Sequence, residues 1–240
     1  MKSRMCVVAC ALLAAVCLPL KGSAQDPLST VLRSSGYTVS LDLNFNRKNR
    51  SSVQRALELL DDRPNAYATG FVVGDGLVMT AYHTVSGSLS APKRRLLGLP
   101  LDDELEVRAM VGGCDAKLVK FDADADLALL RVCRSPRRAE ALVFQVSPGQ
   151  DENLLVIAQP NGDKAVTRGV FNGTYMLGSQ QFWAAKIDGR DGYSGSPVFN
   201  ERGELVGVFS RYDFPHNVAL ITPSLSARKL LEDYSAVAQQ

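Results

Sequence analysis

The chain has 240 residues, of which 46% are hydrophobic and 22% are charged, so it can bury a sizeable core but is too short for a long modular enzyme. Its formal net charge is +2, and without the basic residues of its first 24 positions the count is 24 basic against 25 acidic residues, a net charge of −1. A near-neutral chain has no general electrostatic attraction for nucleic acid or anionic membranes, so neither is an expected partner.

The first 24 residues are typical of a secretory signal peptide. The basic start Met1–Arg4 precedes an apolar run over Met5–Leu20, and small residues at 22–24 close the segment. We therefore expect cleavage after Ala24 and a secreted or periplasmic protein with no membrane span after signal removal. A membrane anchor is the alternative, although 16 residues interrupted by a proline are short for a span, and lipidation at Cys10 is a minor one.

Residues 25–65 form an expected N-terminal extension, which is polar and mixed up to residue 50. Within Ser51–Asp62, apolar residues recur at helical spacing. This spacing predicts a short helix that ends before Arg63-Pro64-Asn65.

Two series of short apolar runs broken by turns follow, a pattern typical of a β-sandwich or β-barrel protein. The two series are separated around Arg134–Arg138, and the second ends in a helix over Pro223–Tyr234, with Thr222 or Ser224 as its cap. The expected strands are 69–73, 77–80, 105–111, 116–121 and 126–132 in the first series, and 154–158, 165–171, 182–187, 197–199, 205–210 and 218–221 in the second.

The first series contains the two cysteines that remain after signal removal, Cys114 and Cys133. The runs on either side of the polar segment 122–125 predict a hairpin in which the numbers of paired residues sum to 247. The two cysteines satisfy that sum, so their sulfurs are expected to face each other and to form a disulfide in an oxidising compartment. Such a bond would stabilise the fold by about 3 kcal/mol. Two reduced, buried cysteines are the alternative.

Three short segments contain residue types suited to acyl transfer, each at the end of an expected strand. His83 follows an apolar strand, and an imidazole suits general-base work near neutral pH. Asp126 opens another apolar strand. Ser194 lies between two glycines in Asp191–Val198, and these glycines allow a tight turn that brings backbone N–H groups close to a substrate carbonyl. Each segment alone has an ordinary structural explanation, but the order His, Asp, Ser with gaps of 43 and 68 residues is hard to reach by accident.

The segments TAYHTV, DLALL and GYSGSP around these residues resemble those of the trypsin-like (chymotrypsin-fold) serine peptidases, especially the bacterial HtrA-like and V8-like branch. The resemblance covers roughly residues 66–232. It implies an all-β fold of two packed antiparallel six-stranded β-barrels, with a catalytic triad in the cleft between them. An N-terminal helical segment and a C-terminal helix complete the expected fold. We accordingly assign 66–141 to the first β-barrel and 142–240 to the second β-barrel with the C-terminal helix.

The same resemblance implies a role for each residue. Ser194 would attack the scissile carbonyl, His83 would take its proton and return it to the leaving amine, and Asp126 would orient the imidazole. The backbone N–H groups of Gly192 and Ser194 would form the oxyanion hole. Tyr193 stands where animal digestive members carry an aspartate that pairs with a newly cut N-terminus. That activation switch is therefore expected to be absent.

Substrate preference is less clearly encoded. Asp188 precedes Ser194 by six residues, about where trypsin-like members place an acid that binds Arg or Lys side chains. Arg211, in the strand expected to line the same substrate pocket, could neutralise it. His216 could instead favour acidic side chains, as in V8-like relatives, or be an exposed loop histidine. No substrate preference follows.

The predicted function is a secreted serine endopeptidase that cleaves protein or peptide substrates through an acyl-enzyme. We expect a monomer that lacks the PDZ domain of HtrA relatives. No cofactor and no metal are expected, because the mature chain has only two histidines and two cysteines. A non-catalytic binding module on a protease-like scaffold is the alternative from another class, and an esterase with the same triad also stays open.

Overall fold

The structure is a computed structural model that describes residues 38–58, 63–133 and 142–238. The expected signal peptide over 1–24 and the expected separator around Arg134–Arg138 lie outside these residues. No helix in the described ranges is long and apolar enough to cross a bilayer.

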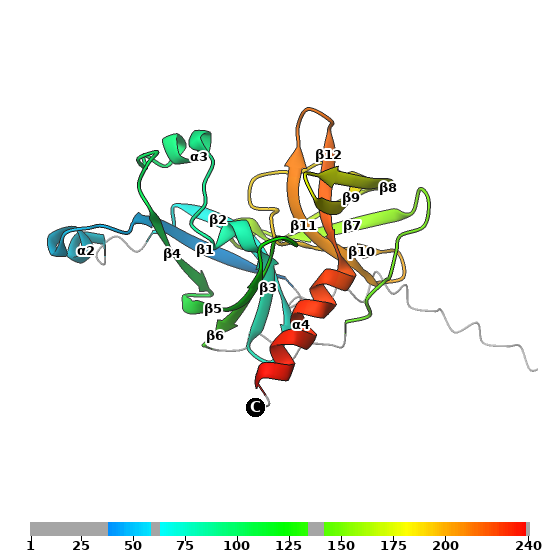
Figure 1. The fold of residues 1–240 in the computed structure, drawn as a ribbon, viewed down its shortest axis with the longest axis horizontal. Coiled ribbons are helices and arrows are strands. Elements are labelled where there is room, and N and C mark those ends of the chain that lie inside the picture. The colour runs from blue at the N-terminus through cyan, green and yellow to red at the C-terminus, as the bar shows by residue number, and fades with distance from the viewer. Residues whose placement is uncertain (1–37, 59–62, 134–141, 239–240) are drawn as a thin grey trace, which may run out of the picture.

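The chain folds into two closed antiparallel β-barrels of six strands each, with a C-terminal helix packed against both (Figure 1). This confirms the expected fold class. The strand order is β1-β2-β3-β6-β5-β4 in the first barrel and β7-β8-β9-β12-β11-β10 in the second, which is the same connectivity. The strands of the first barrel are β1 (Thr38–Arg47), β2 (Ala66–Gly74), β3 (Leu77–Ala81), β4 (Leu105–Val111), β5 (Cys114–Asp122) and β6 (Leu127–Val132). Those of the second are β7 (Asn153–Ala158), β8 (Ala165–Leu177), β9 (Gln180–Lys186), β10 (Pro197–Asn200), β11 (Leu205–Asp213) and β12 (Val218–Pro223).

The first barrel begins at Thr38, within the segment expected to be an extension, and not at residue 66. β1 pairs with β2 on one side and with β4 on the other, so it closes the barrel. Its apolar residues recur at every second position, which is the period of a strand with one buried face. The four that enter the core of the barrel are Val39, Leu41, Leu43 and Phe45.

In the described ranges, three helices and two short 3-10 turns accompany the barrels. The expected first helix is present as α2 (Ser52–Glu58), and the Ser51 and Gln54 side chains each accept a hydrogen bond from the other residue's backbone N–H, forming a capping box. A helix that the sequence pattern did not predict, α3 (Ala91–Leu96), lies in the long connection between β3 and β4. The other three elements are η1 (Tyr82–Thr84), η2 (Pro160–Gly162) and α4 (Ser224–Ala238).

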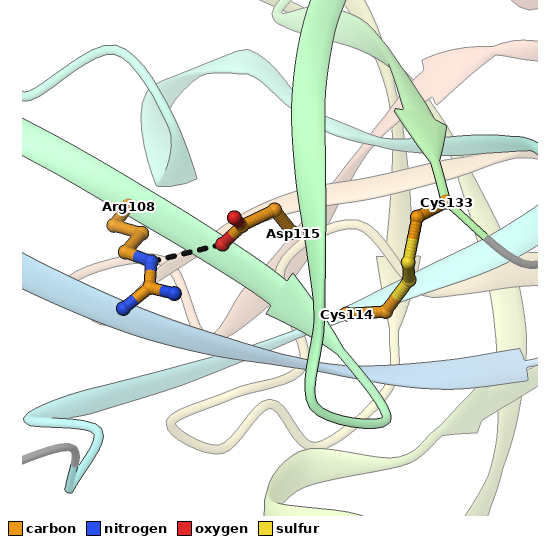
Figure 2. Close-up of a disulfide and its surroundings, with 4 residues drawn as sticks. All are labelled: Arg108, Cys114, Asp115 and Cys133. Atoms are coloured by element: carbon orange, nitrogen blue, oxygen red, sulfur yellow. Dashed lines mark hydrogen bonds and ion pairs between the residues drawn. A yellow bond between two sulfur atoms is a disulfide. The ribbon is translucent and has the colours of Figure 1, made fainter.

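The β5–β6 hairpin carries the expected disulfide between Cys114 and Cys133, whose Cα atoms are 6.0 Å apart (Figure 2). The expected register is wrong by one residue or two. Paired numbers sum to 248 at the open end and to 249 beyond a bulge between Leu118 and Lys120. The two cysteines are therefore not direct partners in the β5–β6 ladder. Cys114 pairs with Val111 of β4, and Cys133 lies just beyond the end of β6. The distance between the two cysteines still permits the bond.

α4 packs along both barrels, contacting β5 and β6 of the first and β11 and β12 of the second (Figure 1). Its buried residues Ala227 and Leu230 belong to a core cluster that also draws side chains from both barrels. The two hydroxyls expected to cap this helix have other partners. Thr222 Oγ1 donates to the carbonyl of Ala125 at 2.8 Å, and Ser224 Oγ donates to the carbonyl of Gln145.

Candidate active site

His83 lies in η1, the single 3-10 turn that directly follows β3. The turn is anchored by Thr84, a buried residue whose Oγ1 donates a hydrogen bond to the carbonyl of Ala81 at 2.7 Å. The His83 side chain is 36% exposed, so its ring is supported on one side and open to the cleft on the other.

Asp126 lies in the turn between β5 and β6 and not in the strand that follows. Its φ of 53° is in the left-handed region, which aspartate tolerates better than most residues. The carbonyl of Asp126 accepts a hydrogen bond from the Tyr82 N–H at 3.1 Å, which fixes this turn beside η1. The residue itself is only 4% exposed.

The three predicted catalytic side chains meet between the two barrels. His83 Nδ1 is 2.9 Å from Asp126 Oδ2 and 3.1 Å from Oδ1, and the His83 backbone N–H donates to Oδ1 at 2.9 Å. On the other side of the ring, His83 Nε2 is 3.0 Å from Ser194 Oγ. An imidazole whose Nδ1 faces a carboxylate carries its proton there, so Nε2 is left to accept the serine proton.

Asp126 is held ionised by its neighbours. Burial raises the pKa of its carboxyl, but hydrogen bonds from His83 and Ser210 outweigh that effect and bring the pKa below its ordinary value. Ser210, on β11 of the second barrel, donates its hydroxyl to Asp126 Oδ2. The guanidinium of Arg211 lies 3.7 Å from the same oxygen. A carboxylate placed in this way can stabilise a positively charged imidazolium.

Ser194 lies in the loop between β9 and β10, where the backbone makes two left-handed turns. Gly192 and Gly195 have φ values of 86° and 85°, a region that glycine enters without strain. A Cβ on Gly195 would lie 2.1 Å from both the Thr69 carbonyl and Thr80 Oγ1. Only glycine therefore lets this loop pack closely against β2 and β3 of the other barrel.

Thr69 ties the Ser194 loop to the first barrel. This fully buried residue of β2 donates its backbone N–H to the carbonyl of Ser194 at 3.0 Å. Its Oγ1 donates to the carbonyl of Gly192 at 2.8 Å and accepts from the Gln159 N–H at 2.9 Å. Neither Thr69 nor Ser210 was among the predicted site residues, because the sequence marks them only weakly: each is a polar residue within a largely apolar strand.

The two backbone N–H groups expected to form an oxyanion hole are unengaged. In the described part of the chain, neither the Gly192 N–H nor the Ser194 N–H has a hydrogen-bond acceptor, whereas the N–H groups of Tyr193, Gly195 and Ser196 all do. Tyr193 itself is buried, with its ring against Phe209 and its hydroxyl 3.1 Å from Thr167 Oγ1. The loop can therefore offer two free donors beside Ser194 Oγ.

The residues suggested for a substrate pocket are not brought together. A cavity of about 460 Å³ opens beside His83 and Ser194, and Arg211 lines it but Asp188 does not. Asp188 is exposed, and Arg211 pairs with Asp126 instead of neutralising Asp188. His216, on the β11–β12 hairpin, is exposed and lies 2.8 Å from Asp213 Oδ2, which in turn accepts a hydrogen bond from the Tyr175 hydroxyl.

Fold and site together define a protein of the chymotrypsin type. Residues 68–208 match the family described as "Trypsin-like peptidase domain", and the chain belongs to that family. The class expected from the sequence, a trypsin-like serine peptidase, is thereby confirmed at the level of the family.

Curated relatives agree with this assignment. The chain is 28% identical over 179 residues to "Protease Do-like 2, chloroplastic" of Arabidopsis thaliana, covering 69% of this chain and 28% of the relative. It is 31% identical over 153 residues to a "Probable periplasmic serine endoprotease DegP-like" of Pseudomonas putida (strain F1), and this match covers 60% of this chain and 28% of the relative. The chain thus spans about three tenths of the length of these relatives.

Among solved structures, the active form of the Rv3671c protease from M. tuberculosis superimposes with a TM-score of 0.59 at 18% sequence identity, covering 96% of this chain and 93% of that one. An inactive form of the same protease gives a TM-score of 0.58 at 18% identity, covering 87% and 93%. At this identity the likeness concerns the fold alone.

Proposed function

We propose that this chain is a serine endopeptidase that cleaves peptide bonds through an acyl-enzyme, with His83, Asp126 and Ser194 as its triad. The observation that carries the proposal is the continuous contact from Asp126 through both ring nitrogens of His83 to Ser194 Oγ, at 2.9 Å and 3.0 Å. Nucleophile, base and orienting carboxylate all lie within hydrogen-bond reach of their neighbours.

In the first half of the reaction, Ser194 Oγ forms a bond to the scissile carbonyl carbon while its proton passes to His83 Nε2. The carbonyl oxygen becomes an oxyanion, and the unengaged N–H groups of Gly192 and Ser194 are its donors. Collapse of this intermediate breaks the C–N bond, and the proton on His83 goes to the leaving amine. Water then attacks the acyl-enzyme with the same base, which releases the carboxylic acid and free Ser194.

We further propose that the protein acts on protein or peptide substrates outside the cytoplasm. The signal-like segment over 1–24 and the word "periplasmic" in the names of DegP-like relatives support export. A disulfide between Cys114 and Cys133 suits an oxidising compartment.

Labelling of the purified protein with a fluorophosphonate tests the proposal, because this probe reacts with an activated serine. We expect stoichiometric labelling of the wild type, and none of Ser194→Ala. We also expect labelling of His83→Ala to be slower by at least a hundredfold. Ser235→Ala, which removes an exposed serine on α4, is the matched control and should label like the wild type. A folded wild-type protein that takes no label would overturn the proposal and favour a non-catalytic binding module.

A further inference from the structure

The cavity beside the triad belongs mostly to the first barrel. Its walls come from β1, β2, the His83–Thr84 turn and the α3 connection, and the second barrel adds only the segment around Gly192, together with Pro160 and Arg211. Its volume of about 460 Å³ is in the range of pockets that bind small organic ligands. Since His83 and Ser194 line the same cavity, whatever occupies it lies against the reacting atoms.

Most of the surface that lines this cavity is apolar, although polar side chains also reach it. Leu43 and Phe45 of β1 are each only 2% exposed. Leu89 and Leu97 pack partly against the same core, whereas Leu96 of α3 is 78% exposed and therefore accessible to a bound side chain. The members of this apolar wall are Leu43, Phe45, Leu89, Leu96, Leu97 and Pro160.

The connection that carries α3 is itself held in shape. Arg94 donates from Nη1 to the carbonyls of Pro100 and Asp103 at 2.9 Å and 2.8 Å, and from Nε to the carbonyl of Leu89 at 3.2 Å. The Arg94 guanidinium thus joins the segment before α3, at Leu89, to the segment after it, at Pro100 and Asp103. Leu96 at the end of α3 and its neighbours Leu89 and Leu97 therefore lie in a connection whose shape is fixed by hydrogen bonds.

The charged groups that line the cavity are already paired within the protein. Lys93 of α3 lies 3.3 Å from Asp191 of the Ser194 loop, and Arg211 lies 3.7 Å from Asp126. His83, which also lines the cavity, is bonded to Asp126. Among the described residues, each charged side chain that lines the cavity thus has an opposite charge near it, and this favours an apolar side chain as the occupant.

The reaction itself decides which half of the substrate lies there. His83 Nε2 must reach the leaving nitrogen to protonate it, so the residue that follows the scissile bond lies on the His83 side of Ser194. The cavity is on that side, within the barrel that supplies His83. On the side of the second barrel, Gly189 lies close to the rings of Phe209 and Tyr212: an added Cβ would lie 2.7 Å from Tyr212 Cδ2. The rings fill the space beside this glycine, which does not line the cavity.

We propose that this cavity binds a large apolar side chain on the leaving-group side of the scissile bond, so that the protein cleaves preferentially before Leu, Ile, Met or Phe. This inference rests on the proposed endopeptidase function and adds a substrate class to it. Leu96 is its specificity-determining residue, because it is the most exposed apolar side chain of the wall.

The test is a digest of reduced and alkylated serum albumin, in which mass spectrometry identifies the residue that follows each cleaved bond. For the wild type we expect large apolar residues at that position at least threefold above their abundance in the substrate. Leu96→Glu should abolish this enrichment, because it replaces an apolar side chain of the wall with a carboxylate that an apolar substrate side chain would have to desolvate. Leu101→Glu is the matched control: Leu101 is exposed on the same connection but outside this cavity, so it should keep the wild-type profile.

Fluorophosphonate labelling of the same samples separates the two ways of failing. A wild type that labels and cleaves, but shows no apolar enrichment, would overturn the cavity inference and leave the endopeptidase proposal intact. Equal loss of enrichment in Leu96→Glu and Leu101→Glu would also overturn it, because the effect would then belong to the connection as a whole. Absence of both label and cleavage in the folded wild type would overturn the endopeptidase function, and the cavity inference with it.

Discussion

Thr69 connects the two halves of the site through two hydrogen bonds to the Ser194 loop. It lies on β2, yet it bonds the carbonyls of Gly192 and Ser194 through its hydroxyl and its backbone N–H. Fixing the Gly192 carbonyl sets the orientation of the peptide that follows it. Thr69 is therefore a positioning residue for the Ser194 loop, and it would act through the backbone on both the nucleophile and the proposed oxyanion donors.

Replacing Thr69 with valine should impair turnover more than substrate binding. Thr69→Val keeps the shape of the side chain but leaves the Gly192 carbonyl and the Gln159 N–H without their partner, so the loop shifts. We expect kcat for a peptide substrate to fall by about tenfold to a hundredfold, the scale of a misplaced catalytic group, with KM within about twofold of the wild type. Thr69→Ser restores the hydroxyl and should recover most of kcat. Equal losses in both variants would contradict the positioning role.

The lowered pKa of Asp126 gives a pH signature in stability. Because its folded-state pKa is below the unfolded value of about 3.9, its ionisation contributes stability that is fully present above that value and is lost as pH falls through the folded pKa. Asp126→Asn lacks this contribution. The difference in unfolding free energy between wild type and Asp126→Asn should therefore be constant near neutral pH and shrink below about pH 4. Urea unfolding of both proteins from pH 7 to pH 3 measures it, and a difference that grows on acidification would refute the assignment.

At the level of single residues, the sequence predicts the candidate catalytic residues better than the residues that hold them in position. His83, Asp126 and Ser194 are recognisable because their neighbours form short contiguous segments. Ser210 and Thr69 act across 84 and 123 residues of chain, on Asp126 and Gly192 respectively. No local pattern can reveal such contacts, since they exist only after the barrels have packed.

Among the elements, the β5–β6 hairpin links the disulfide to the site. Cys114 and Cys133 join its open end (Figure 2). Its closed end carries Asp126. The bond links residues that are 19 positions apart, so its main expected effect is to lower the conformational entropy of the unfolded chain. It lies at the opposite end of the hairpin from the turn that holds Asp126.

Removing this disulfide should cost stability and leave the chemistry in place. The double variant Cys114→Ser with Cys133→Ser is expected to lose about 3 kcal/mol of unfolding free energy. Its fluorophosphonate labelling at 25 °C should stay within about twofold of the wild type, because the Asp126 turn is held by Tyr82 and Ser210. Denaturant titrations with and without a reductant measure the loss, and reduction should destabilise only the wild type. A reductant effect on the double variant would show that the loss has another origin.

The strands that the sequence predicts best are those with clear breaks at both ends. The run 105–111 coincides with β4, and 77–80 falls short of β3 by one residue. β1 is not predicted although its apolar residues alternate, because the segment contains as many polar as apolar residues up to Phe45 and is read as a polar extension. The register error has another cause: the turn comprises residues 123–126 and not 122–125, which raises the sum of paired numbers to 249 beside it. The bulge between Leu118 and Lys120 then brings the sum to 248 at the open end.

For the whole molecule, the two barrels share one connectivity and one interface. No internal sequence repeat marks this likeness, yet each barrel follows the same strand order. Between them lies a single apolar cluster, to which the first barrel contributes Phe71 and Met79, the second Phe199 and Val208, and α4 its buried face. Since the proposed triad takes His83 and Asp126 from one barrel and Ser194 from the other, we expect the packing of this cluster to affect the distance between them.

Loosening that cluster from the side of α4 should therefore affect both stability and the site. Leu230 is only 3% exposed and packs among side chains of both barrels, so Leu230→Ala is expected to cost about 2–5 kcal/mol of unfolding free energy. Val237→Ala, on the same helix but 65% exposed, is the matched control and should change stability by less than about 0.5 kcal/mol. Thermal and denaturant unfolding give these values, and labelling below the transition reports on Ser194. If α4 only covers the surface, the two variants will be equally stable; if it holds the barrels together, Leu230→Ala alone will label more slowly while still folded, because His83 and Ser194 then lose their fixed separation.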